Sequence, residues 1–167
     1  SAELAAYARS VRHHGVGGSL EDIVLLGNDW CMSEIHAAMG RSQLHRVDAN
    51  VDHRNRMVER YRAGLGAKSW LTIPSYPDTI RHAYYKFPTL LAAQVDCLKF
   101  RRILYQDYGI ENGAIYNPPC HLQPVLRKKY GYSEGLFPIA ESFLNRQLCP
   151  PIHSAITEAE VDRAIDA

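Results

Sequence analysis

One long amphipathic stretch, between residues 41 and 65, constrains the fold of this chain more than any other feature. Apolar residues recur there at helical spacing and form one stripe, in which Arg54 is the only polar member. The stripe consists of Leu44, Val47, Val51, Val58, Tyr61 and Leu65. Because the other face is charged, the pattern predicts a single amphipathic helix over residues 41–65. In a chain of 167 residues, such a helix usually packs along a sheet or joins two subdomains.

Shorter segments on both sides of this stretch indicate a mixed fold. Helices are predicted over residues 3–14, 35–39, 96–108, 138–148 and 157–165, and strands over residues 23–26, 69–73, 83–91 and 113–117. Ser33, Asp96 and Thr157 are predicted N-caps. Leu98, Ile103 and Leu104 are expected to face the core. Because helices come first and strands mixed with helices follow, the order favours an α+β fold over a regular βαβ series.

Composition and charge exclude several classes of protein. The formal net charge is +1, from 19 basic and 18 acidic side chains, which argues against a general nucleic-acid binder. No apolar run approaches the roughly 20 residues that span a bilayer, and the first residues do not form a signal peptide. The four cysteines are widely spaced and lack a C-x-x-C pair, which is typical of reduced thiols in a cytoplasmic protein.

Eight histidines and four cysteines raise the question of a metal site. The nearest arrangements are Cys31 with His36, Cys120 with His121, and Cys149 with His153. None matches a paired-ligand spacing for zinc, so we predict no metal.

The sequence offers two further candidate sites, and neither has the residues that its chemistry needs. A nucleophilic thiolate at Cys120, beside His121, lacks a third group to orient it. The glycine-rich residues 15–18 match neither the dinucleotide-binding pattern nor a P-loop. The residues by themselves therefore predict a soluble α+β domain without an identified chemistry.

A family resemblance adds what the residues alone do not supply. Residues 27–40 read GNDWCMSEIHAAMG and are followed by Gln43 and Leu44. They resemble a hallmark of the DegT/StrS-type sugar aminotransferases, fold-type I enzymes that use pyridoxal phosphate to aminate nucleotide-linked keto-sugars for polysaccharides or antibiotics. Further segments resemble the family in the same order, at residues 6–15, 116–124, 137–141, 148–151 and 157–165. The resemblance spans essentially the whole chain.

The resemblance implies that this chain is the C-terminal portion of such an enzyme. Residues 41–167 would form its small α+β domain, with a short, mostly antiparallel sheet packed by helices, and residues 1–40 would pack on an absent large domain. That absent part would hold the lysine that binds pyridoxal phosphate covalently. The lysines present, at positions 68, 86, 99, 128 and 129, lie in no resembling context. We therefore expect no catalysis from this chain alone, and as partners a second copy or the missing domain.

The resemblance also implies binding residues. The family has an asparagine followed two positions later by arginine, where this chain has Asp29 and Cys31, with Asn28 one step early. Asn28 is the expected donor to the cofactor phosphate, because a carboxylate at Asp29 would repel it. His121 and Tyr116 are expected to line the cleft for the nucleotide sugar. The departures at Asp29 and Cys31 favour an alternative, a non-catalytic module for dimerisation or nucleotide-sugar binding.

Overall fold

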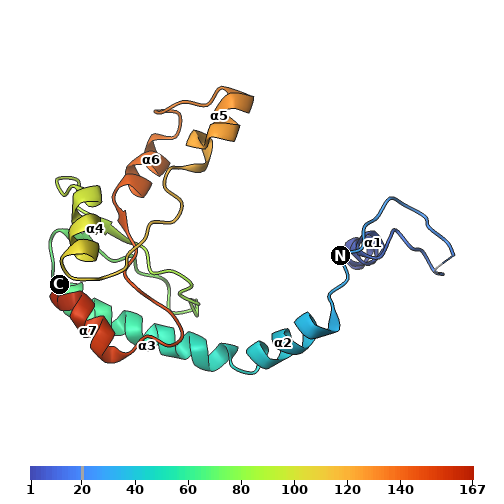
Figure 1. Cartoon of the computed structure of the whole chain (residues 1–167), viewed down its shortest axis with the longest axis horizontal. Coiled ribbons are helices and arrows are strands. Elements are labelled where there is room, and N and C mark those ends of the chain that lie inside the picture. Colours follow the sequence, from blue (N-terminus) through green and yellow to red (C-terminus); the bar gives the residue numbers. More distant parts are fainter. Residues whose placement is uncertain (20) are drawn as a thin grey trace. The chain divides into compact units, whose positions relative to one another are not determined.

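The computed structural model describes residues 1–19 and 21–167, which form two compact units, Ser1–Val47 and Asp48–Ala167 (Figure 1). The first unit contains α1 (Ala2–Arg12) and α2 (Glu34–Leu44). The helices of the second are α3 (Val47–Leu65, whose first residue closes the first unit), α4 (Cys97–Gln106), α5 (Pro124–Tyr130), α6 (Pro138–Asn145), α7 (Glu158–Asp166) and the 3-10 turn η1 (Cys120–Leu122). Its strands are β1 (Leu71–Thr72), β2 (Thr89–Leu91) and β3 (Gln147–Leu148).

The three strands form one small antiparallel sheet in the order β1-β2-β3. Leu71 pairs with Leu91, and Leu90 pairs with Gln147. The core of this unit gathers the apolar stripe of α3 with residues from the sheet, α4 and α7. Its fully buried members are Val58, Tyr61, Phe87, Leu91, Ile156 and Val161, together with Thr89. The predicted α+β class and the short antiparallel sheet are confirmed.

Helix α7 packs lengthwise on α3, as Figure 1 shows. The Arg60 guanidinium of α3 grips the Asp162 carboxylate of α7 with two parallel hydrogen bonds, and its third contact is Glu158 at 2.8 Å. Thr157 and Glu160 form the predicted capping box at the start of α7. Local capping and a bidentate ion pair therefore fix this helix end.

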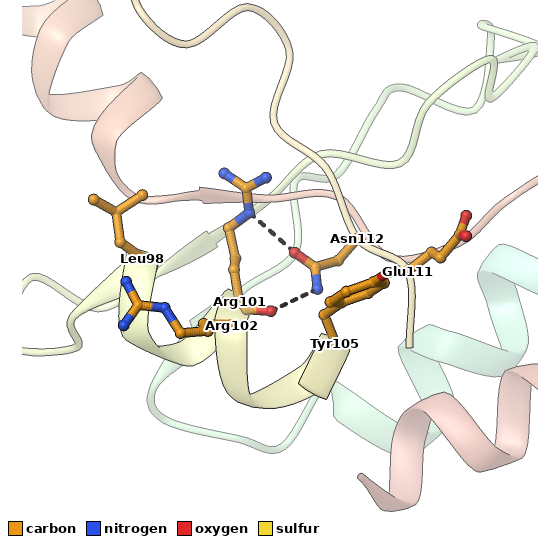
Figure 2. A pocket seen from close by; sticks show the side chains of 6 residues that line it. All are labelled: Leu98, Arg101, Arg102, Tyr105, Glu111 and Asn112. Atoms are coloured by element: carbon orange, nitrogen blue, oxygen red, sulfur yellow. Dashed lines mark hydrogen bonds between the residues drawn. The ribbon is translucent and has the colours of Figure 1, made fainter. Parts of the chain in front are cut away.

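Helix α4 begins where the sequence indicates, because the Asp96 side chain accepts from the Lys99 amide at 2.9 Å. After the helix, the Asn112 side chain accepts from Arg101 Nε and donates to the Arg101 carbonyl, both at 3.0 Å (Figure 2). Leu104 faces the core as expected. Leu98 and Ile103 do not, since they are 66% and 38% exposed.

The prediction of a single helix over residues 41–65 is wrong. The structure has two helices, separated at His45 and Arg46. The Arg46 amide donates to the Gln43 carbonyl, three residues back, so a tighter turn replaces the α-helical ladder. The apolar stripe is buried only from Val51 onward, and Leu44 is exposed.

All four predicted strands are shorter than expected or missing. Of residues 69–73, only Leu71–Thr72 is a strand, and the other three fall short as well. Residues 23–26 form only the isolated bridge of Ile23 with Val16, because two successive amides bend back to the Gly15 carbonyl. Residues 113–117 form only the bridge of Gly113 with Cys149. These segments lack the continuous ladder that makes a strand.

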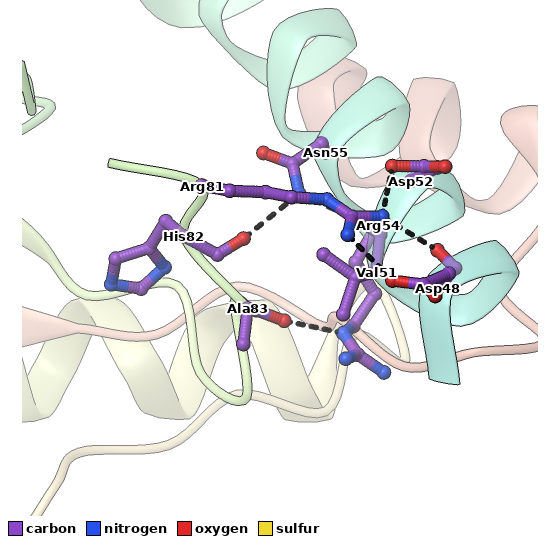
Figure 3. A network of polar contacts seen from close by, with 8 residues as sticks. All are labelled: Asp48, Val51, Asp52, Arg54, Asn55, Arg81, His82 and Ala83. Carbon is purple, nitrogen blue, oxygen red and sulfur yellow. Dashed lines mark hydrogen bonds and ion pairs between the residues drawn. The ribbon is translucent and has the colours of Figure 1, made fainter. Parts of the chain in front are cut away.

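The third is residues 83–91, of which only Thr89–Leu91 is a strand. Side chains of α3 bind backbone carbonyls that a longer strand would use for pairing (Figure 3). Arg54 donates to the Ala83 carbonyl at 2.7 Å, and Asn55 donates to the His82 carbonyl at 2.9 Å. Arg81 also reaches α3, where it pairs with Asp48 and Asp52. This network ties the loop to the helix.

No helix among the residues described combines the length and apolar character that a membrane crossing requires.

Candidate functional site

The turn at residues 27–33 is clamped to the end of α1 by backbone hydrogen bonds. The Asn28 amide donates to the Val11 carbonyl at 2.8 Å, and the Asn28 carbonyl accepts from the His14 amide at 3.1 Å. The Trp30 amide then donates to the Arg12 carbonyl at 2.8 Å. The backbone of the turn is therefore held in place, so its side chains project from a defined position.

Two glycines make this clamp possible. Gly15 has a φ of +79°, a conformation that only glycine adopts without strain. A Cβ on Gly27 would overlap the Gly15 amide nitrogen and lie 2.7 Å from the Val11 carbonyl oxygen. The chain crosses itself here too closely for any side chain.

The two predicted cofactor-binding residues lie on this turn, and both are exposed. The Asp29 carboxylate accepts a 3.4 Å hydrogen bond from the Cys31 amide. Asp29 therefore stabilises the turn itself, as an Asx-type turn does. The Asn28 side chain faces solvent from a fixed backbone and can donate to an anion.

A shallow groove beside the turn is lined in part by basic side chains. It is lined by residues that include Tyr7, Arg9, Arg12, His13 and Cys31. Arg9 and Arg12 lie in the last turn of α1, where they also offset the partial negative charge of the helix end. Cationic groups therefore approach the turn from α1.

The second candidate region, residues 116–123, lies in the other unit. His121 is 7% exposed, and its Nε2 lies 2.9 Å from Glu141 Oε1. The His121 ring also meets the Phe137 ring edge-on, with centroids 4.9 Å apart. Glu141 and Phe137 therefore hold the His121 ring in a buried position. Tyr116, in contrast, is 70% exposed.

Glu141 is the residue that sequence reasoning missed in this region. Its carboxylate accepts from the Gly135 amide at 2.9 Å and the Phe137 amide at 3.1 Å, besides contacting His121. These hydrogen bonds, first those from Gly135 and Phe137 and then that from His121, lower the pKa of Glu141. An acidic residue in the first turn of α6 was the available signal, because such residues often reach back to amides before the helix.

Other polar groups of the second unit line a groove on α4. The groove on α4 in Figure 2 is lined by Leu98, Arg101, Arg102, Tyr105, Glu111 and Asn112. Arg101 and Asn112 bind each other there, and the hollow is open to solvent. Burial raises the pKa of the Cys97 and Cys149 thiols, which disfavours a nucleophilic thiolate at either of these two positions. No group of three potential metal-ligating side chains occurs in the described part of the chain.

Curated proteins are similar to this chain in sequence. GDP-perosamine synthase of Caulobacter vibrioides is 30% identical over 171 residues, which cover 99% of this chain and 44% of that protein. The chain spans less than half the length of the curated relatives it matches.

Solved structures share the fold as well. A DegT DnrJ EryC1 StrS aminotransferase from Brucella abortus aligns with a TM-score of 0.85 at 30% identity, over 99% of this chain and 43% of that one. S. venezuelae DesV aligns with a TM-score of 0.88 at 25% identity, over the same shares. The profile of the DegT/DnrJ/EryC1/StrS aminotransferase family matches residues 1–167, which confirms the resemblance inferred from residues 27–40. The chain belongs to the DegT/DnrJ/EryC1/StrS aminotransferase family.

Proposed function

We propose that this chain is the C-terminal part of a pyridoxal-phosphate-dependent aminotransferase that aminates a nucleotide-linked keto-sugar. The observation that carries the proposal is the family match over the whole chain, which covers less than half of each relative. GDP-perosamine synthase, by its name, makes an amino sugar bound to a nucleotide. Residues 41–167 would then be the small domain of a fold-type I enzyme.

The residues present fit pyridoxal phosphate in part. Aminotransferases of this family use that cofactor, which when bound carries the amino group from the donor to the keto-sugar. The exposed amide of Asn28 fits a phosphate, whereas the Asp29 carboxylate does not. None of the lysines at positions 68, 86, 99, 128 and 129 lies in a segment that resembles the family's cofactor-lysine region. The lysine that holds the cofactor would therefore come from outside this chain.

The roles of this chain are binding and orientation. Asn28 would donate to the cofactor phosphate across a dimer interface, and the basic end of α1 would add positive charge there. Tyr116, with the loop that His121 holds, would line the cleft for the nucleotide sugar. No proton transfer is assigned to a residue of this chain.

Exposed apolar side chains support a partner for the first unit. Neither α1 nor α2 has a buried residue. The large apolar residues exposed in the described part of this unit are Leu4, Tyr7, Ile23, Val24, Leu26, Trp30, Met32, Ile35, Met39, Leu44 and Val47. A monomer rarely exposes so many. Residues 1–40 would therefore pack on the lysine-bearing domain, in a dimeric enzyme.

The test compares the chain alone with the chain combined with the lysine-bearing N-terminal portion. The combination should show the absorbance of bound pyridoxal phosphate and should aminate a nucleotide keto-sugar, with glutamate or glutamine as amino donor. The chain alone should do neither. Cofactor trapped by borohydride in stoichiometric yield on a lysine of this chain would contradict the proposal.

A non-catalytic module for dimerisation or nucleotide-sugar binding is the second candidate. Asp29 and Cys31 favour it, because they replace the asparagine and arginine that the family has at this turn. In that case the combination would retain no pyridoxal phosphate after unbound cofactor is removed, while the chain alone would still dimerise or bind a nucleotide sugar.

A further inference from the structure

The loop that carries Tyr116 is zipped along the segment that forms α6 and β3. Residues 113–121 run antiparallel to residues 141–149. Between one contact and the next, the number of residues passed is the same on both segments, to within one residue. The contacts in order are Gly113 with Cys149, Ile115 with Gln147, Asn117 with Leu144, and His121 with Glu141. Only the first is a backbone pair. Side chains make the other three, so the loop keeps strand-like register without being a strand.

Gln147 holds the start of the loop. Its side chain is 3% exposed, and its Oε1 accepts from the Ile115 amide. The backbone of Gln147 is at the same time paired with Leu90 in the sheet. The residue just before Tyr116 is therefore fixed to the buried edge strand of the sheet.

Glu141 holds the end of the loop. Its carboxylate binds His121 Nε2 and the amides of Gly135 and Phe137. A carboxylate accepts hydrogen bonds only, so the Nε2 of His121 carries the hydrogen. Because the ring also packs against Phe137, His121 has one position and cannot turn outward without breaking both contacts.

We propose that Glu141 and Gln147 are positioning residues, which hold residues 113–121 so that Tyr116 meets the nucleotide sugar in a preset conformation. This rests on the proposed function, since it takes the sugar nucleotide as the ligand of the loop. Neither residue touches the substrate. His121 serves the site through its bond to Glu141. A loop ordered before binding loses little conformational entropy when the ligand arrives, so the fastening improves substrate affinity.

The first experiment measures amide hydrogen exchange in the chain itself. Glu141→Ala should speed exchange at Gly135, Phe137 and the loop amides of residues 115–123 about tenfold or more, because local opening becomes easier. Glu160→Ala is the matched control. That carboxylate also accepts a backbone amide before a helix, but at α7. It should speed exchange near Thr157 and leave the loop as it was.

The second experiment uses the complete enzyme. Glu141→Ala should raise the KM for the nucleotide sugar about tenfold and leave the half-reaction with the amino donor unchanged, because only the sugar substrate meets the loop. Glu141→Gln retains an acceptor oxygen, so it should restore part of the affinity. It also provides a folded variant if the alanine variant does not fold. Glu160→Ala should change neither the KM for the nucleotide sugar nor the half-reaction with the amino donor.

Unchanged loop exchange in both Glu141 variants would overturn the proposal, as would faster loop exchange with an unchanged KM. An equal effect on the donor half-reaction would also overturn it. A wild-type enzyme that aminates no nucleotide keto-sugar would instead contradict the proposed function, while the exchange experiment still judges the fastening of the loop.

Discussion

Gly15 and Gly27 cross so closely that neither can carry a side chain. A Cβ on Gly27 would overlap the Gly15 amide nitrogen, and Gly15 itself has a φ of +79°. This crossing joins the end of α1 to the turn that carries Asn28 and Asp29. Gly27, the first residue of the family hallmark, is therefore required because two backbone segments pack directly on each other, independently of any ligand.

Replacing Gly27 should open this crossing. Gly27→Ala forces backbone atoms apart, and overpacking of this kind costs about 1–3 kcal/mol. We expect faster exchange of the amides of His14, Asn28 and Trp30, which now bond across the crossing. Gly18→Ala is the control, because nothing lies within 4 Å of a Cβ there. Equal exchange in the two variants would show that the crossing does not hold the turn.

A buried phenol should make the second unit sensitive to high pH. Tyr61 is fully buried and donates to the Pro151 carbonyl at 3.1 Å. Burial raises the pKa of Tyr61 above its ordinary value of 10.0. The unfolded chain therefore releases this proton first, and the free energy of unfolding should fall as the pH rises above about 10.

Tyr61→Phe tests this by urea unfolding at pH 7 and pH 11. At pH 7 the variant should lose about 1 kcal/mol with the hydrogen bond. At pH 11 the difference from the wild type should shrink, because phenylalanine cannot ionise. Tyr105→Phe, at an exposed position, is the control. A difference that grows with pH would contradict the expected sign.

The Arg60–Asp162 pair should matter at neutral pH and vanish in acid. The hydrogen bond from Arg60 lowers the pKa of Asp162 below its ordinary value of 3.8. A lowered carboxyl pKa means stabilisation that is present above 3.8 and lost as the pH falls through the folded-state pKa. Arg60→Met should therefore be less stable than wild type at pH 7, with the gap closing in acid. Arg56→Met, on the exposed face of α3, should show no such pH-dependent gap; a gap that persists in acid would assign the Arg60 effect to packing.

Local signals predicted well in this chain. Ser33, Asp96 and Thr157 are N-caps as expected, because a cap depends on residues within three positions. Residues 27–40 identified the family for a similar reason, since the turn and the helix after it are contiguous in sequence.

The features that the sequence did not reveal depend on side chains that bind groups distant in the sequence. Arg54 and Asn55 on α3 bind the carbonyls of residues 82 and 83, and the Gln147 side chain accepts from the Ile115 amide, so the strand expected over residues 83–91 is shortened and the one over 113–117 is missing. Glu141 was missed because its partner His121 is 20 residues away. An apolar pattern cannot report such contacts. The roles assigned to Asn28, Asp29, Tyr116 and His121 stay predictions.

Gly64 of α3 lies directly against Ile165 of α7, so a substitution there sets two opposing effects against each other. A Cβ there would lie 2.7 Å from Ile165 Cγ2 and 2.8 Å from its Cδ1. Gly64→Ala should gain about 0.8–1.0 kcal/mol of helix propensity and lose about 1–3 kcal/mol to overpacking. We expect net destabilisation, measured by urea unfolding. Combining it with Ile165→Val removes the Cδ1 methyl, so the double variant should regain part of the loss. If Gly64→Ala alone is more stable than wild type, Ile165 moves aside at little cost and the two helices are not held apart at this contact.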